Sequence, residues 1–547
     1  MASAAQGAGD QPATSANGAD AGQDGWDNSR SAAGPYNPWL IVAMISLPTF
    51  MEVLDTSIAN VSLDHIAGGL SISTDQATWV LTSYLVANAV VIPISGWLSD
   101  AIGRKRYFLI SIALFTLSSL LCGLAPNIGT LIFARVLQGI GGGGLAPVEQ
   151  AMLVDTFPPE KRGMAIAAFA IVVVVGPVLG PTLGGYITEV ASWHWVFLIN
   201  VPFGIVAFFL ADIFVDEPDQ VKNDRAKMLE GGLRIDIVGV LLVVFGLGFL
   251  ELTLDRGERE DWFSSGMIVA TASISAISLV ALCFWEWRQK NPVVDIKLLR
   301  NRNFSATLII MAVTGLILYG TTQLIPQMLQ QVMGYSSFDS GLALTFGGIA
   351  TVLMVPFAGA MAGKVDVRLL LGVALLIQAG ALWHMTHMTA DITFFDAAFA
   401  RTLQAVGLPF LFVPINAAAY NGLPRQSTAQ ASSMLNVARN IGGSIGISMS
   451  QSWLVGAMQT RQSQLVENLN PLNPNYNDWM ARAKGVFAST VDPNAIPTGV
   501  LYQQVMRQAA MMGFLDVFRA LMILVLVLTP TVFFLKGGRS AGGGMGH

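Results

Sequence analysis

Fourteen mostly apolar stretches of about 20 residues recur along this sequence and limit what it can fold into. A helix of about 20 apolar residues spans the hydrocarbon core of a bilayer. Within that core a helix satisfies its own backbone hydrogen bonds, so each stretch is expected to be helical. We therefore predict an all-α polytopic membrane protein with fourteen transmembrane helices. The predicted spans are residues 39–59, 77–98, 107–125, 130–153, 165–187, 196–214, 235–254, 267–287, 304–325, 339–362, 369–388, 395–420, 431–456 and 513–535.

The composition supports a membrane protein and excludes several other classes. Hydrophobic residues make up 53% of the chain and charged residues 12%, against about 25% charged in soluble domains. The net charge of −5 argues against the basic surface that nucleic acid requires. Two cysteines are too few for a disulfide scaffold or a cysteine-based metal site, and we predict no metal and no cofactor. The sequence lacks a Walker motif, which argues against ATP as the direct energy source.

The positive charges indicate how the chain is oriented. If the N-terminus is cytoplasmic, twenty of the thirty Lys and Arg residues fall in cytoplasmic segments, six fall outside and four lie within spans. Cytoplasmic loops carry an excess of Lys and Arg. We therefore predict a multi-pass protein with both termini in the cytoplasm.

An internal repeat relates the two ends of the chain. Residues 135–141 read RVLQGIG and residues 401–407 read RTLQAVG, at an offset of 266 residues. Two related groups of six spans then flank an inserted pair, 235–254 and 267–287, in a 6+2+6 arrangement. Parallel repeats of this kind are a transporter design, with the substrate site between the halves near the midplane.

The connecting segments complete the predicted domain organisation. Residues 1–37 are rich in Gly, Ala, Ser and Asp, which is typical of a disordered tail and not of a signal peptide. The predicted parts are a disordered cytoplasmic tail 1–37, an N-terminal six-helix bundle 38–215, an inserted two-helix segment 216–302 with cytoplasmic loops, a C-terminal six-helix bundle 303–535 that includes a long periplasmic loop 457–512, and a Gly-rich cytoplasmic tail 536–547.

Two motifs combine small residues with charge or proline. The sequence GWLSDAIGRKR begins at Gly96; its glycines, including Gly103, allow close helix approach, and Asp100 can pair with a nearby arginine to latch two helices. This stretch, with Arg104 included, resembles the loop motif of the major facilitator superfamily. The second half has Gly363 in the slot of Asp100, which argues against a second latch.

The second motif, GPVLGPTLGG, lies in the fifth span. Its small residues make a smooth groove for a neighbouring helix, and its prolines permit bending. It resembles the antiporter motif of drug:proton exporters; ordinary glycine packing is the alternative. The residues concerned are Gly176, Pro177, Gly180, Pro181, Gly184 and Gly185.

Further sequence extends the resemblance over roughly residues 38–535. The first span contains LDTSIANV from Leu54, and residues 191–204 read ASWHWVFLINVPFG. With fourteen spans, the chain resembles the EmrB/QacA type of drug exporter. The resemblance implies the major facilitator fold and proton-driven export of hydrophobic or amphipathic drugs across the bacterial inner membrane. It also implies an EmrA-type periplasmic adaptor and a TolC-type outer-membrane channel.

Charged residues inside the spans point to a proton-coupling site. A charge at the bilayer centre costs ~2.5–3.5 kcal/mol, so each needs a partner or a role. Asp55 lies in the outer half of the first span, and Glu52 precedes it by three residues on the same face. Two neighbouring carboxylates disfavour double ionisation, which suits a proton carrier. For Glu52 the alternative is a polar crevice or the outer headgroups.

The fourth span adds two candidates. Arg135 can hold a carboxylate ionised, and the resemblance makes it the proton-coupling arginine; a structural ion pair is the alternative. Glu149 is a candidate inner protonation site. Elsewhere, we expect Glu251 at the outer headgroups and interpret Arg401 as a relic of the repeat.

Apolar, aromatic and amide side chains are expected to line the substrate cavity, although most aromatics in membrane helices serve packing or the interface belt. The candidates are Trp79, Tyr84, Gln138, Phe169, Tyr319, Gln323, Phe410, Asn416, Asn436 and Arg439.

Three other functions compete with drug export by alternating access. Within transport, the chain could export one dedicated metabolite or take up a solute; the GPVLGPTLGG stretch argues against uptake only. A membrane enzyme would need a His/Asp or Ser/His group at one face, which the scattered histidines do not supply. A transport-dead receptor or scaffold would not need Asp55, Arg135 and the Gly-Pro stretch together.

Overall fold

The computed structural model describes residues 32–33, 36–230, 236–289, 292–362, 364–470, 472–486 and 495–535. The predicted disordered tails, 1–37 except for residues 32–33 and 36–37, and 536–547, lie outside the described residues, as does Gly363. The described chain is helical throughout its regular structure.

Each predicted span corresponds to one helix or to a short succession of helices. The helices at these positions are α1 (Pro38–Val61), α3 (Thr74–Ile102), α4 (Arg104–Gly123), α5 (Ile128–Gly142) with α6 (Leu145–Thr156), α7 (Pro159–Val190), α8 (His194–Leu198) with α9 (Asn200–Phe214), α11 (Ile237–Arg256), α12 (Gly266–Arg288), α13 (Arg302–Met333), α14 (Ser337–Ala362), α15 (Val367–Met385), α16 (Phe394–Ala419), α17 (Thr428–Glu467), and α19 (Ala495–Leu528) with the 3-10 helix η5 (Thr529–Phe534). The connecting helices are α2 (Leu63–Leu70), α10 (Asp219–Glu230) and α18 (Pro474–Val486).

Two of these helices differ from simple apolar spans. Within the described residues, twelve helical segments are long and apolar enough to cross a membrane, and α7 adds a thirteenth as a pair bent by 41° between Lys161–Pro177 and Leu179–Val190. The bend is explained by prolines inside the helix, which remove backbone hydrogen bonds. The remaining helix, α17, buries polar residues such as Ser432, Asn436 and Arg439 among other helices, so it does not have the composition of a lipid-facing span.

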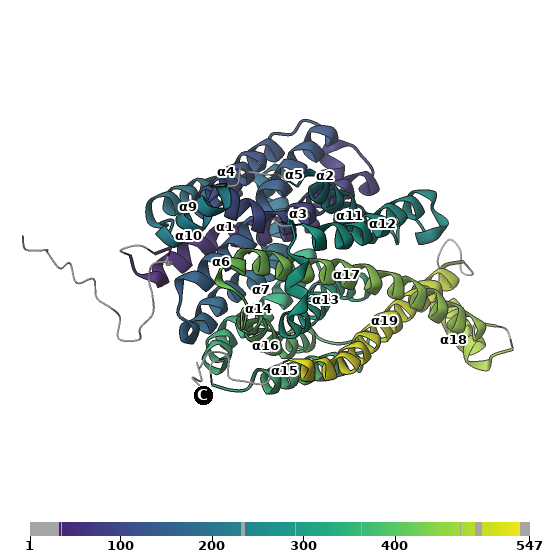
Figure 1. Cartoon of the computed structure of the whole chain (residues 1–547). Helices are drawn as coiled ribbons and strands as arrows, with labels where there is room; N and C mark the ends of the chain where they lie inside the picture. Colours follow the sequence, from purple (N-terminus) through teal and green to yellow (C-terminus); the bar gives the residue numbers. More distant parts are fainter. Residues whose placement is uncertain are drawn as a thin grey trace, which may run out of the picture.

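The helices fall into two groups that meet along two helix pairs. In Figure 1 the helices α1 to α5 and α9 lie above most of the later helices, α6 and α7 reach down to α17 and α14, and α11 lies beside α12. Helix α7 packs along α14, and α3 packs along α17, so these contacts join the first group to the second. At one end of the bundle, Gly96 of α3 lies so close to α17 that an added Cβ would be 3.0 Å from the carbonyl oxygen of Ala429.

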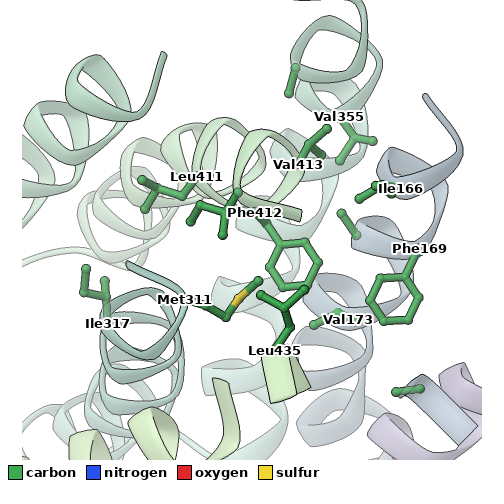
Figure 2. Close-up of a cluster of buried hydrophobic side chains, with 14 of the residues drawn as sticks. Ile166, Phe169, Val173, Met311, Ile317, Val355, Leu411, Phe412, Val413 and Leu435 are labelled. Carbon is green, nitrogen blue, oxygen red and sulfur yellow. The ribbon is translucent and has the colours of Figure 1, made fainter. Parts of the chain in front are cut away.

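An apolar cluster fills the centre between the two groups. Figure 2 shows the ring of Phe412 from α16 between Leu435 of α17 and Phe169 of α7. The rings of Phe169 and Phe412 are stacked, with centroids 6.0 Å apart. Because lipid is as apolar as these side chains, the cluster stabilises the assembly through close packing and not through removal of water.

The predicted periplasmic loop 457–512 is mostly helical. Helix α17 continues to Glu467 and α19 begins at Ala495, so α18 lies between two extended helix ends. Figure 1 shows α18 at the far end of α17 and α19, and none of its residues is buried.

Candidate functional site

A buried ion pair joins α5 to α1. The Nη1 atom of Arg135 lies 2.6 Å from Oδ2 of Asp55, and neither side chain is exposed. Asp55 Oδ1 also accepts hydrogen bonds from Gln138 Nε2 at 2.9 Å and Asn200 Nδ2 at 2.7 Å. Arg135 Nε donates to the carbonyl oxygen of Val80 at 3.0 Å. When both groups are ionised the pair has no net charge, which offsets much of the cost of burial.

Tyr84 links this pair to a second carboxylate. Its ring lies under the guanidinium of Arg135, 4.2 Å from Cζ to the ring centroid, which stabilises the cation. Asn88, one turn further along α3, donates from Nδ2 to the Tyr84 hydroxyl at 3.4 Å and to Glu52 Oε1 at 2.9 Å. Glu52 makes no ion pair with any described residue, and its buried Oε2 atom has no hydrogen-bond donor. It is partly buried, so a polar crevice describes it better than the headgroup region.

A third carboxylate, from α6, lies against α1. Glu149 of α6 is fully buried and accepts a hydrogen bond from Ser46 of α1, while its Oε2 has no partner. No cation of the described chain pairs with it. Ser46, Glu52 and Asp55 follow one another along α1. Ser46 and Asp55 are nine residues apart, or about 14 Å along the helix axis. Two carboxylates therefore lie on α1, and a third, from α6, contacts the same helix through Ser46.

Three amides connect the halves beside Glu149. Gln150 of α6 donates to Asn416 Oδ1 of α16, and Asn436 Nδ2 of α17 donates to Gln150 Oε1 at 2.9 Å. Gln150 and Asn416 are separated by 266 residues, the offset of the sequence repeat. Because equivalent positions meet only near the axis that relates two repeats, this pair marks the axis between the halves. Two predicted cavity residues, Asn416 and Asn436, are therefore used in closing the interface in this state.

The other predicted cavity residues divide into a central and a peripheral set. Phe169 is buried, Tyr319 packs against Gly443, and Phe410 and Gln323 are half-buried. Trp79 lies elsewhere: its ring carries the guanidinium of Arg256 at 4.5 Å, between α3 and the inserted helix α11. We therefore correct the assignment of Trp79 to the central cavity.

The residues of the GWLSDAIGRKR motif lie at the contact between α3, α4 and α6. Arg104 forms a close ion pair with Asp155 of α6 and a longer one with Asp100, at 3.8 Å. Gly103 has φ +105°, a conformation that favours glycine, and a Cβ there would strike the carboxylate of Glu217. Asp155 was missed from the sequence, where a carboxylate at the end of the fourth span was its only signal.

The GPVLGPTLGG stretch packs against α1, the helix that carries Glu52 and Asp55. A Cβ at Gly176 would lie 2.7 Å from Val53 Cγ1, one at Gly180 would strike Ser57, and one at Gly184 would lie 3.2 Å from Ile58 Cα. Ser57 Oγ donates to the carbonyl oxygen of Pro177 at 3.1 Å. This carbonyl is available because a proline inside the helix lacks the backbone N–H that would otherwise bond to it. Pro181 and Gly185 lie in the same bent helix.

Two further buried charges have partners from distant helices. Glu251, expected at the outer headgroups, is only 5% exposed and accepts a hydrogen bond from Ser444 of α17 at 2.7 Å. Arg401 is buried without a carboxylate and donates to Gln404 Oε1 at 2.7 Å and Thr322 Oγ1 at 3.0 Å. Spacing along the chain could not show either partner, because helices distant in sequence provide them.

Arg439, also in the predicted cavity set, is a buried cation without a hydrogen-bond acceptor among the described residues. Its side chain is 5% exposed, yet it makes no hydrogen bond or ion pair with any residue that the structure describes. Its Cζ atom lies 5.9 Å from the ring centroid of Phe412. The next residue, Asn440, reaches across to Asn88 Oδ1 at 3.5 Å, so this part of α17 faces the Glu52 region.

Comparisons with known proteins agree with this architecture. The Major Facilitator Superfamily model matches residues 45–447. The chain is 36% identical to the multidrug export protein EmrB of Haemophilus influenzae over 499 residues, which covers 91% of this chain and 95% of that protein. It is 34% identical to the fatty acid resistance protein FarB of Neisseria gonorrhoeae, over 93% of this chain and 98% of FarB. The fold resembles the proton:xylose symporter XylE with a TM-score of 0.57 at 13% identity, over 92% of this chain and 96% of XylE.

Proposed function

Because the chain belongs to the major facilitator superfamily, and within it to the EmrB/QacA type of multidrug export proteins, we propose that it exchanges protons for hydrophobic or amphipathic compounds by alternating access. As a member of this superfamily it is a multi-pass secondary transporter and not an enzyme. Similar proteins are named for multidrug export and for fatty acid resistance, so drugs and fatty acids both fall within the proposed substrates.

The arrangement of carboxylates along α1 carries the proposal. Asp55 is held by Arg135, Gln138 and Asn200, whereas Glu52 and Glu149 have no cationic partner. Protonation of Asp55 would remove the charge that balances Arg135, so this pair distinguishes two protonation states strongly. A proton and a substrate are coupled when they favour different conformations of the same site. Glu52 and Glu149 then supply further proton-binding groups toward the other face.

The moving parts follow from the contacts between the halves. We take the bundles 38–215 and 303–535 as the two rocking units, with the inserted segment 216–302 between them. Here the halves meet at the end that carries Gly96 and the Gln150–Asn416 pair, which in the predicted orientation is the cytoplasmic end. The Arg104–Asp155 ion pair holds the first half together at that end and would rearrange as it opens.

Proteoliposomes with an internal pH-sensitive dye test the proton coupling. An amphipathic dye such as ethidium should evoke proton movement in wild type, and Asp55→Asn should abolish it. Proton movement that survives in Asp55→Asn would move the coupling to Glu52 or Glu149. Proton movement absent with every compound tested would contradict antiport and favour one dedicated substrate.

We further propose an inner-membrane location with both termini cytoplasmic, and cooperation with an EmrA-type periplasmic adaptor and a TolC-type channel. Helix α18 supports this because it has no buried residue, and its main contact within the described chain is with α19, its neighbour in sequence. Removal of 457–512 would also delete Arg461 and Arg507, which bond to Asp516, Val332 and Ala390.

A shorter deletion of α18, residues 474–486, is therefore the better test. It should preserve transport in vesicles and abolish resistance in cells. Equal loss in both assays would reject an adaptor role for α18.

A further inference from the structure

Arg439 differs from the other buried arginines in lacking any acceptor. Arg135 has Asp55, Arg104 has Asp155, and Arg256 has Asp75. Even Arg401, which lacks a carboxylate, has two hydrogen bonds. A buried guanidinium without an acceptor has lost its water without compensation, which is costly.

No acidic residue of the second half can supply the missing partner in this state. Every Asp and Glu of α13 to α17 and α19 is at least partly exposed, and none pairs with Arg439. Glu52, on the first half, is near enough for its charge to interact with Arg439, but its carboxylate bonds to Asn88 and the two side chains form no ion pair. A direct ion-pair partner for Arg439 must therefore come from a bound molecule or from a rearrangement of the protein.

The surroundings of Arg439 define what such a molecule would look like. One side is apolar: Phe412 lies under the guanidinium, Phe169 stacks on Phe412, and Leu435 lies one turn before Arg439 on α17 (Figure 2). The other side is polar, where Asn440 bonds to Asn88. A cation between an aromatic cluster and neutral amides suits an anionic head on an apolar body.

We propose that Arg439 binds the carboxylate of an amphipathic acid, whose apolar body packs against the cluster around Phe412 and Phe169. The inference rests on the proposed export function, because it assigns the substrate class of that same central site. A guanidinium presents its donors in a planar fork that matches a carboxylate, and aromatic rings give an apolar body a large contact area. Fatty acids and arylalkyl carboxylic acids share this chemistry.

Direct binding to the purified full-length transporter tests the proposal without a proton gradient. The ligands are decanoate and pyrenebutyrate, each compared with its primary amide, which keeps the apolar body and removes the charge. Arg439→Gln should weaken binding of both acids by about tenfold or more, the scale of charge-assisted hydrogen bonds, while the amides change little. Arg439→Lys keeps the charge without the fork and should fall between.

Arg401→Gln is the matched control, because it removes a buried cation whose two Nη atoms already donate to acceptors within the protein. It should leave the acid-to-amide ratio unchanged. Equal weakening of acids and amides by Arg439→Gln would overturn the proposal, as would wild-type protein that does not prefer the acids. Decanoate and pyrenebutyrate share the carboxylate and differ in the apolar body. If only one of them depends on Arg439, the site is selective for that kind of acid, a fatty acid or an aryl acid.

The rival explanation is that Arg439 pairs with Glu52 in another state of the cycle. If Arg439 serves a bound acid, Glu52→Gln removes a competing carboxylate and should tighten acid binding. If Glu52 holds Arg439 in place for binding, Glu52→Gln should weaken acids and amides alike, which contradicts the proposal. The proposed export function is tested separately, by proton movement in wild-type and Asp55→Asn vesicles. The role of Arg439 is tested by equilibrium binding, so the two can fail independently.

Discussion

The arginine sites of the two halves share a frame and differ in one group. In the first half, Arg135 and Gln138 both bond to Asp55. In the second half, the repeat offset of 266 places Thr321 where Asp55 stands, and Gln404 Nε2 donates to Thr321 Oγ1 at 2.6 Å. The hydrogen-bond frame persists although the carboxylate does not. The proposed proton site therefore depends on a carboxylate that only one half has at this position, while both halves retain the same hydrogen-bond frame.

The same division holds for the other buried charges. The first half holds Glu52 and Glu149 and the inserted helix α11 holds Glu251, all without a cation partner in the described chain. The second half holds Arg401 and Arg439 without a carboxylate. The proposals above divide the roles accordingly, with protons assigned to carboxylates of the first half and the anionic group of a substrate assigned to Arg439 alone in the second half.

The largest contrast is expected between Asp55 and its counterpart. Asp55→Asn should eliminate substrate-evoked proton movement in proteoliposomes, because an amide cannot exchange the proton. Thr321→Val should retain most of it, since the Thr321 hydroxyl carries no charge and bonds only to Gln404 and to backbone carbonyls of its own helix. Similar losses in both variants would show that the halves share proton transport.

The two arginines should differ in their contribution to stability. Arg135→Gln leaves Asp55 buried without its cation and should destabilise the protein by about 3–5 kcal/mol. Arg401→Gln leaves only neutral acceptors and should cost about 1–3 kcal/mol. Unfolding in detergent, measured for both variants in parallel, gives the difference; a larger loss for Arg401→Gln would contradict the assignment of the charge-balanced pair to the first half.

Helix packing offers a third comparison between the halves. Gly180→Ala puts a methyl group against Ser57 and should cost about 1–3 kcal/mol through overpacking of α7 on α1. Gly372→Ala in α15 meets nothing within 4 Å and should be neutral or stabilise the helix by up to about 1 kcal/mol. Thermal unfolding of the two variants measures this, and destabilisation by Gly372→Ala alone would refute the packing argument.

The smallest effect is expected from restoring the missing carboxylate. Thr321→Asp should stabilise the protein by about 1–2 kcal/mol, because Arg401 gains a counter-charge whose benefit is mostly offset by desolvation. Thr321→Asn, equally polar and uncharged, is the control. Destabilisation by Thr321→Asp relative to Thr321→Asn would mean that Arg401 is not placed as Arg135 is.

Much of the fold was predictable because its signal is local. Each predicted span matches helical structure in the described chain. This includes α17, which is held in the bundle by contacts of its buried polar residues with neighbouring helices. The GPVLGPTLGG stretch predicted close packing of a neighbouring helix on α7, because small residues at helical spacing leave room for one, and only the structure identifies that helix as α1. The sequence was less informative on Trp79 and Glu251, because a half-polar helix end does not reveal which neighbour covers it.

The sequence by itself determined the spans, the repeat, the family resemblance and the residue types available for proton transfer, because these depend on composition and spacing along the chain. The tertiary structure decided which charges are paired. Asp55 meets Arg135 across 80 residues and Asn200 across 145, and Gln150 meets Asn416 across 266. Electrostatic compensation depends on distances of a few ångströms in space. For that reason Asp55 is balanced and Arg439 is not, although both were singled out as charges within a span.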